Sequence, residues 1–206
     1  MNINESYRED LNALNALFDK LNKCFFESKL SKPVITLQYD PKKRFGWFTA
    51  WDSWQCGENR SPEINVSTNF LDRDPIEKAT TMLHDMCHLY AYQHNIKDCS
   101  RGDTYHNRFF KQIAEAHGLT VKASKKYGCG ETSLTPAARE MIKKFLSNFT
   151  FFKRNENAKT GSESQSTRKY ICPKCRQSVR ATKDVNILCG ICLCQMVKEE
   201  SSKKAG

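Results

Sequence analysis

Two C-x-x-C pairs near the C-terminus, Cys172–Cys175 and Cys189–Cys192, constrain this chain most strongly. Each pair places two sulfur atoms on one tight turn, and four thiolates complete a tetrahedral zinc site with no open position. The segment 170–197 has few large apolar residues, so metal binding must supply its folding energy. The spacing therefore predicts a zinc ribbon with one structural Zn²⁺. A redox pair is the alternative, and Cys194 is a further thiol that competes with Cys192.

The net charge of +10 is concentrated at the same end of the chain. From residue 153 onward there are 12 basic and 5 acidic residues, whereas residues 1–152 hold 21 basic and 18 acidic ones. Such a segment attracts polyanions, and nucleic acid is the commonest one in a cell. We expect salt-sensitive contacts with the DNA backbone, although ribbons also bind proteins. The candidate DNA-binding residues are Lys169, Lys174, Arg176, Arg180 and Lys183, and Tyr170 either stacks on a base or packs on the ribbon.

The sequence favours a protein that is neither inserted in a membrane nor secreted. No apolar run is long enough to span a bilayer, and residues 1–10 lack the apolar core of a signal peptide. We therefore expect a cytoplasmic protein, associated with the nucleoid if the host is bacterial. Ten cysteines in a reducing compartment favour metal sites over disulfides. The oligomeric state stays open.

Residues 1–152 show the pattern of a mixed α+β domain. Apolar residues at intervals of three and four from Tyr7 to Phe25 predict an amphipathic helix. Strands are predicted at 34–39, 45–51 and 63–70. In the last of these, apolar and polar residues alternate, which predicts one buried face and one exposed face. A final helix is predicted to begin at Thr135 and Pro136.

The helix after the third strand carries two histidines. Asp74 is placed as its N-cap and Pro75 at its first position, which fixes where it begins. His84 and His88 are four residues apart, so they lie one turn apart on one helix face and both imidazoles can reach one ion. Zinc favours such nitrogen ligands.

A third histidine follows, in what is predicted to be the first turn of the next helix. A catalytic zinc takes three protein ligands and keeps a fourth position for water. His106 is the natural third ligand beside His84 and His88, and His94 or His117 is the alternative. The sequence thus predicts one catalytic Zn²⁺ in addition to the structural ion.

These elements resemble the SprT-like (Spartan-type) zinc metallopeptidases over about residues 5–150. The resemblance rests on the His-x-x-x-His helix after three strands and on Tyr105-His106-Asn107 downstream, and many members carry a C-terminal zinc ribbon. It implies a zincin-like domain with an N-terminal helix, a small antiparallel or mixed sheet and two metal-bearing helices. It also implies protein substrates, and the best-known members degrade proteins covalently trapped on DNA.

One position departs from the family motif His-Glu-x-x-His, in which the glutamate is the general base. Asp85 occupies that position in this chain. Aspartate keeps the acid–base chemistry, but its side chain is one methylene shorter, which withdraws the carboxylate by about 1.5 Å. A misplacement near 1 Å can cost on the order of a hundredfold in rate. Asp85 is therefore the general base, or it is a solvated helix carboxylate or a partner that supports one of the metal ligands.

Four segments are expected: a metallopeptidase domain at 1–152, a flexible basic linker at 153–169, a four-cysteine zinc ribbon at 170–197 and a disordered tail at 198–206. The linker prediction rests on the lack of large apolar residues in that segment. The favoured function is a zinc metalloendopeptidase in DNA repair that acts on DNA-bound or DNA-crosslinked proteins. The alternative is a catalytically weak or inactive zinc-containing DNA-binding protein.

Overall fold

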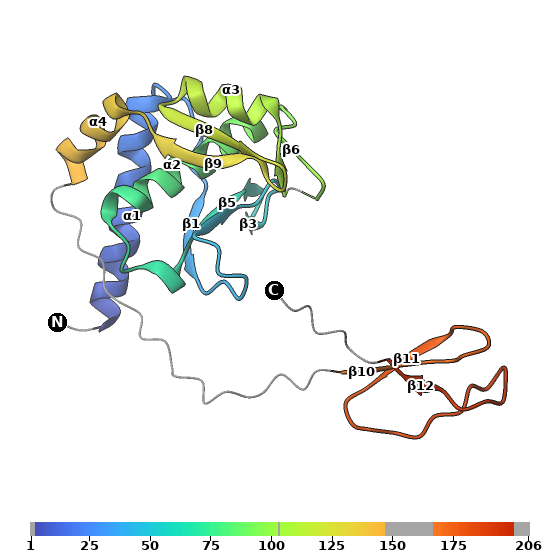
Figure 1. Cartoon of the computed structure of the whole chain (residues 1–206). Helices are drawn as coiled ribbons and strands as arrows, with labels where there is room; N and C mark the ends of the chain where they lie inside the picture. Colours follow the sequence, from blue (N-terminus) through green and yellow to red (C-terminus); the bar gives the residue numbers. More distant parts are fainter. Residues whose placement is uncertain (1–2, 103, 147–166, 200–206) are drawn as a thin grey trace. The chain divides into compact units, whose positions relative to one another are not determined.

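The computed structural model describes residues 3–102, 104–146 and 167–199. The chain divides into two compact units, Met1–Glu156 and Asn157–Gly206. The first unit is a mixed α+β fold with several small sheets (Figure 1). Most of the predicted linker at 153–169 and of the predicted tail at 198–206 lies outside the described residues. Among the described residues, no helix has the length and apolar character that crossing a bilayer requires.

The predicted N-terminal helix is confirmed as α1, Ile3–Phe25. Its residues Leu14, Phe18 and Leu21 are fully buried in the main core, as their spacing indicates. Tyr7 stands at the beginning of the same apolar stripe but is 41% exposed. The first turns of α1 therefore extend past the core that the rest of the helix covers.

The three predicted strands form one small sheet with the order β1-β5-β2. Strand β1 (Val34–Gln38) runs parallel to β5 (Glu63–Ser67), and β2 (Gly46–Phe48) runs antiparallel to β5. Each strand is shorter than the sequence pattern suggests. Strand β5 ends at Ser67 because residues 68–70 form a turn of 3₁₀-helix. Strand β2 lies at the edge of this sheet.

The prediction of one exposed face on the third strand is wrong, because all five residues of β5 are buried. Strand β5 is central in its sheet, and its polar residues find partners inside the fold. The carboxylate of Glu63 accepts hydrogen bonds from Nε2 of Gln38 (2.6 Å), from Nε1 of Trp54 (3.1 Å) and from Thr36. Buried polar side chains are tolerated when they are paired in this way.

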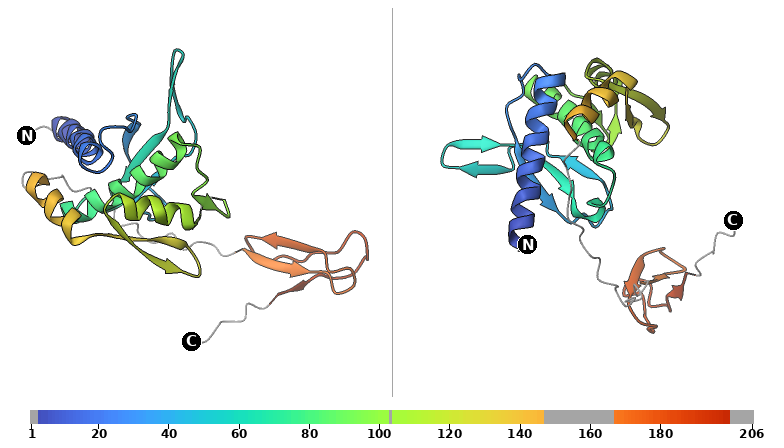
Figure 2. Two further views of the ribbon diagram at one scale, coloured as in Figure 1. Left: turned by 90° about the horizontal axis from the view of Figure 1, so that it is seen from above. Right: turned by 90° about the vertical axis from the view of Figure 1, so that its left-hand side faces the viewer.

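A β-hairpin that the sequence pattern did not indicate follows β2. It consists of β3 (Trp54–Cys56) and β4 (Asn59–Ser61), and it stands out from the remainder of the first unit (Figure 2). Gly57 in its turn has a φ of 61°, a conformation that glycine adopts without strain.

The central element of the first unit is helix α2, Pro75–Gln93. It packs against α1, α3 (Arg108–Ala116) and α4 (Pro136–Leu146), as well as against β2 and β5. Leu83, Met86 and Cys87 of α2 are fully buried, so Cys87 is a core residue. Helix α2 is therefore fixed on several sides, and it can hold functional side chains at defined positions.

A second sheet packs against α2 and α3 and has the order β6-β7-β9-β8. Its strands are β6 (Cys99–Ser100), β7 (Tyr105–His106), β8 (Leu119–Ser124) and β9 (Gly128–Leu134). The prediction that His106 lies in a helix is therefore wrong. Pairing of His106 with Cys99 and Gly128 holds it in a strand, and α3 begins only after Asn107.

The second unit is a small three-stranded sheet with the order β11-β10-β12. Strand β10 (Arg168–Ile171) lies between β11 (Ser178–Ala181) and β12 (Val197–Lys198). It begins two residues before the predicted start of the ribbon. The buried residues of this unit are Tyr170, Cys172, Cys189 and Met196. Such a small core agrees with the expectation that a metal stabilises this unit.

Candidate metal centres

Helix α2 presents two histidines on one face. The Asp74 side chain accepts a hydrogen bond from the backbone N–H of Ile76 (2.7 Å), and Pro75 occupies the first turn, so the predicted helix start is confirmed. His84 and His88 follow one turn apart, with ring centroids separated by 5.0 Å. The helical repeat therefore brings both imidazoles to the same side of α2.

The third histidine reaches the same place from strand β7. The backbone N–H of His106 donates to the carbonyl of Tyr127 (3.1 Å), which fixes the strand beside β9. A Cβ on Gly130 would lie 2.7 Å from Nδ1 of His106, so only glycine leaves space for this ring. The approach of β9 to His106 therefore depends on Gly130.

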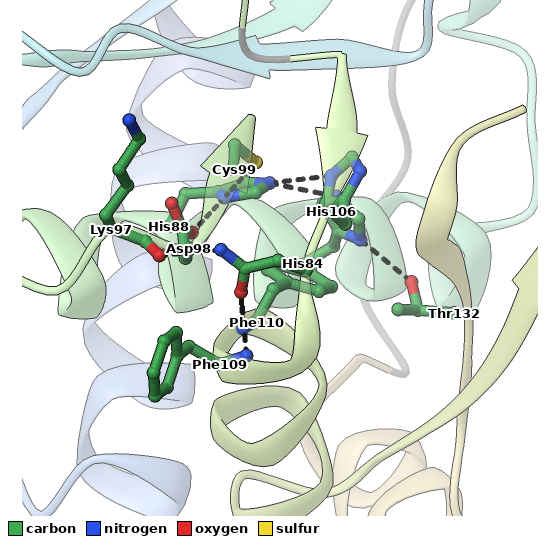
Figure 3. Close-up of polar contacts among 10 residues, drawn as sticks. His84, His88, Lys97, Asp98, Cys99, His106, Phe109, Phe110 and Thr132 are labelled. Carbon is green, nitrogen blue, oxygen red and sulfur yellow. Dashed lines mark hydrogen bonds and ion pairs between the residues drawn. The ribbon is translucent and has the colours of Figure 1, made fainter. Parts of the chain in front are cut away.

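The three imidazoles converge on one point through their Nε2 atoms (Figure 3). Nε2 of His88 lies 3.2 Å from Nε2 of His84 and 3.1 Å from Nε2 of His106. Zinc–nitrogen bonds of about 2.0–2.1 Å in a tetrahedral site place the ligand nitrogens about 3.3 Å apart. The observed spacing fits a single zinc ion.

Burial keeps two of these imidazoles neutral. It holds the pKa of His84 well below its usual value and lowers the pKa of His106 to about 4, and the neighbouring His88 lowers both further. A neutral imidazole has the free lone pair that a metal ligand needs. The ring of Phe110 lies under all three histidines, with centroid distances of 4.8 Å to His84 and 4.6 Å to the others.

The Nδ1 atoms of two histidines meet oxygen atoms on the far side of the rings (Figure 3). Nδ1 of His84 lies 3.0 Å from Oγ1 of Thr132, and Nδ1 of His88 lies 2.5 Å from Oδ2 of Asp98. Nδ1 of His106 is buried and has no hydrogen-bond partner among the described residues. His94 and His117 bond the carbonyls of Tyr90 and Ile113 near the ends of their helices and take no part in the cluster.

Asp85 is buried between α2 and strand β2, with 5% of its surface exposed. Its Oδ2 atom has no hydrogen-bond partner among the described residues. Burial raises the pKa of this carboxyl to about 7, against the opposing charges of His88 and Arg44. The site thus holds a carboxyl that can both accept and release a proton near neutral pH.

A pocket of about 400 Å³ opens beside His84 and Asp85. Its wall is formed by residues of β2, α2 and β9 and by Phe45 and Arg73. The lining residues are Phe45, Gly46, Arg73, Thr80, Thr81, His84, Asp85, Gly130, Glu131 and Thr132. Glu131 lines the pocket from the surface, because 55% of its side chain is exposed and its carboxylate lies 4.0 Å from Nζ of Lys122.

Sequence patterns missed the residues that surround the histidines. Thr132 and Gly130 lie on β9, a strand that no sequence pattern had indicated, and Asp98 lies in the segment before β6. The only available signal was the glycine pair Gly128 and Gly130, since glycine inside a strand marks a close backbone approach. The polar atoms of Asp98, Cys99 and His88 also lie within 4.8 Å of one another.

In the second unit, the structure brings the four predicted cysteines together. The sulfur atoms of Cys172, Cys175, Cys189 and Cys192 all lie within 4.8 Å of one another. Sγ of Cys175 lies 3.6 Å from Sγ of Cys189, one from each knuckle. The two knuckles supply all four thiols from their turns, as a tetrahedral sulfur site requires.

The fifth cysteine of this unit lies next to the cluster. Sγ of Cys194 is 3.5 Å from Sγ of Cys172. The backbone pattern nevertheless places Cys194 outside the knuckle. The N–H of Cys172 donates to the carbonyl of Gln177, and in the same way the N–H of Cys189 donates to the carbonyl of Cys194, both at 2.9 Å. Cys194 is therefore the counterpart of Gln177, which follows the first knuckle.

The candidate DNA-binding residues lie on the surface of this sheet and its turns. Lys174, Arg176, Arg180 and Lys183 are exposed, and Lys169 is half-buried and pairs with Glu199 (3.0 Å). Tyr170 is 5% exposed, and its hydroxyl donates to Asp184 (3.1 Å). Of the two roles expected for Tyr170, the structure therefore supports packing on the ribbon.

A comparison with protein families places the first unit. The model of the SprT-like family matches residues 14–127, which include all three histidines and more than half of the chain. No curated protein and no solved structure matched the chain.

Proposed function

The chain belongs to the SprT-like family, and on that premise we propose that it is a zinc-dependent metalloendopeptidase acting on DNA-bound or DNA-crosslinked proteins. The observation that carries the proposal is the convergence of three imidazoles beside a pocket that also contains a buried carboxyl. A site of three nitrogen ligands leaves a coordination position open, as catalysis by zinc requires.

His84, His88 and His106 would hold the catalytic ion. A bound zinc supplies a water of lowered pKa and an electrophile that polarises the substrate carbonyl. The ring of Phe110 packs against all three histidines and blocks access to the ion from that side. Water and substrate would therefore approach from the pocket beside His84.

Asp85 would move the protons of the reaction. Its carboxyl lines the same pocket as His84, and a carboxylate there would accept a proton from water and pass it to the leaving amine. The side chain is one methylene shorter than the glutamate of the family motif. Proton transfer is therefore the step of the reaction that the shorter side chain would slow.

Strand β2 would bind the substrate main chain. The backbone carbonyl of Phe45 accepts a hydrogen bond from the N–H of Ser67, and the N–H of Thr49 donates to the carbonyl of Glu63. The main-chain N–H and C=O groups of alternate residues from 45 to 49 therefore point toward β5. Gly46 and Phe48 therefore direct their main-chain groups toward the open edge, and Gly46 lines the pocket. An extended peptide added at this edge would be held through its backbone, with little dependence on its sequence.

A second candidate function is a DNA-binding protein that keeps the zinc fold without turnover. The observation that favours it is the position of Asp85, whose Oδ2 atom is buried against Gly46. In that case the three histidines would stabilise the first unit through a bound ion and perform no chemistry.

The test is DNA-stimulated cleavage of an added DNA-binding protein by the full chain loaded with zinc. We expect cleavage by the natural protein and none by His84→Ala. His94→Ala is the matched control, since His94 lies at the end of the same helix and outside the cluster. Equal activity in His84→Ala and His94→Ala would refute the metallopeptidase proposal.

Two substitutions of Asp85 separate the two functions. Asp85→Asn keeps the size of the side chain and removes the proton acceptor, so it should abolish cleavage. Asp85→Glu restores the reach of the family carboxylate, and a large gain in cleavage would mean that aspartate limits the rate. Inactivity of the natural protein and of Asp85→Glu, with zinc bound in both, would favour the DNA-binding protein.

The ribbon would hold the structural zinc at Cys172, Cys175, Cys189 and Cys192 and carry the contacts with DNA. Lys174 is exposed, whereas Lys169 is engaged with Glu199. Lys174→Ala should therefore weaken binding to a duplex oligonucleotide and lower the salt slope by about one, and Lys169→Ala should do so less. Identical salt slopes in the natural protein and both variants would argue against DNA binding by this surface.

A further inference from the structure

Among the described residues, Asp98 supplies the carboxylate that contacts a histidine of the cluster. Its Oδ2 atom lies 2.5 Å from Nδ1 of His88, and both side chains are largely buried, with 15% and 13% of their surfaces exposed. The contact is made by the ring nitrogen that faces away from the point where the Nε2 atoms converge (Figure 3).

The main chain around Asp98 is attached to the segment that carries His106. The carbonyl of Asp98 accepts from the backbone N–H of Asn107 (2.9 Å), and the carbonyl of Lys97 accepts from Nδ2 of Asn107 (2.7 Å). Cys99 pairs with His106 in the antiparallel ladder of β6 and β7. The side chain of Asp98 thus contacts His88, while its backbone is hydrogen-bonded to Asn107, the residue that follows His106.

We propose that Asp98 is a positioning residue of the three-histidine site. It fixes the tautomer of His88 and holds the His88 ring so that its Nε2 atom lies beside Nε2 of His106. A carboxylate acceptor keeps the proton on Nδ1, and the lone pair of Nε2 then points at the shared ion. The backbone bonds to Asn107 transmit any movement of β7 to the same carboxylate. The inference rests on the proposed function, since it presumes that zinc binds at the three histidines.

The geometry argues against a metal between Asp98 and His88 themselves. A zinc ion bound to both atoms, with bonds of about 2.0–2.2 Å, would hold them about 3.3 Å apart. The observed 2.5 Å is within hydrogen-bonding distance and leaves no space for an ion between the two atoms. Sγ of Cys99 lies 4.0 Å from the same nitrogen and is a neighbour of this bond.

The experiment compares Asp98→Asn and Asp98→Ala with the natural full chain. Asparagine keeps an oxygen that can accept from Nδ1, whereas alanine removes the acceptor. Asp52→Asn is the matched control, because Asp52 also accepts a hydrogen bond from a side chain of α2, the hydroxyl of Tyr92 (2.9 Å), one turn beyond His88. Zinc affinity is measured by competition with a chelator, and the metal-free chain is melted to follow its fold.

Asp98→Ala should weaken the histidine site about 10- to 100-fold and leave the cysteine site unchanged. Asp98→Asn should lie between Asp98→Ala and the natural chain, and Asp52→Asn should match the natural chain. The readout that a merely structural role would not move is the imidazole ¹⁵N NMR spectrum. In the natural metal-free chain His88 should carry its proton on Nδ1, and in Asp98→Ala it should populate both tautomers.

Unchanged zinc affinity in Asp98→Ala, or a loss fully matched by unfolding of the metal-free chain in both variants, would overturn the positioning role. A third ion per chain that disappears in Asp98→Asn would also overturn it, because Asp98 would then be a ligand. Failure of the proposed function looks different, since the natural chain would then bind zinc at its cysteines alone.

Discussion

Oδ2 of Asp85 packs against the Cα of Gly46, at the side from which a side chain would project. A Cβ built on Gly46 would stand 3.0 Å from this oxygen and 2.6 Å from the backbone carbonyl oxygen of Asn65. The carbonyl belongs to β5, so it cannot move aside without separating two paired strands. Glycine at this position is what lets the edge strand approach the carboxyl of α2.

Gly46→Ala should therefore lower the free energy of unfolding by about 1–3 kcal/mol, the usual cost of forcing a group into a packed region. Peptide cleavage should fall by more than this loss predicts, because β2 and Asp85 are displaced together. Denaturant unfolding and cleavage rates are the measurements. Gly57→Ala is the control, because a Cβ at this position would have no atom within 4 Å. The only cost of that substitution is backbone strain at a φ of 61°. Equal behaviour of the two variants would contradict the steric argument.

Local sequence spacing was sufficient for the parts of the site that one element provides. His84 and His88 are related by the helical repeat, and the Asp74 cap sets where that helix begins. Each cysteine knuckle is likewise a single turn. Such features depend on residues a few positions apart, so their geometry can be read from the sequence.

The rest of the site depends on contacts between distant segments. His106 lies in a strand because it pairs with Cys99 and Gly128, and no local pattern of polar and apolar residues records that pairing. The buried polar face of β5 has the same origin. Glu63 looks solvent-exposed from its alternation with Ile64, but partners from β1 and the β3–β4 hairpin surround it. Tertiary context overrides strand patterning in this way.

Thr132 should support the zinc site through His84. Thr132→Val keeps the shape of the side chain and removes the oxygen that lies 3.0 Å from Nδ1 of His84. Zinc affinity of the histidine site should fall by about tenfold, the lower end of the range for such supporting contacts. Chelator competition measures it. Thr120→Val on the neighbouring strand is the control, because its hydroxyl bonds Ser133 at the surface. A similar affinity in both variants would exclude the role.

Cys192, and not Cys194, should be the fourth ligand of the ribbon. The backbone bonds of the two knuckles match when Cys194 is aligned with Gln177, although its sulfur lies close to Cys172. Cys192→Ser should therefore lose zinc to a competing chelator at concentrations that leave Cys194→Ser fully loaded. Zinc per chain, measured by elemental analysis, gives the result. The reverse order of zinc loss would assign the ligand to Cys194.

Lys78 should make stability depend on pH in the alkaline range. It lies on α2 with 6% of its surface exposed, and burial lowers the pKa of its ammonium group to about 8, although nearby Asp10 raises it. In the unfolded chain the pKa returns to about 10.5. Between these values the unfolded state binds more protons, so this group makes the free energy of unfolding rise with pH, by at most about 1.4 kcal/mol per pH unit.

The measurement is denaturant unfolding of the full chain at pH 8, 9 and 10, for the natural protein and for Lys78→Met. Other groups also titrate in this window, so the difference between the two proteins is the quantity of interest. The natural protein should gain stability relative to Lys78→Met as the pH rises, because the methionine has no proton to release. Lys23→Met, at an exposed position of α1, should follow the natural protein. Parallel curves for all three would mean that burial does not perturb Lys78.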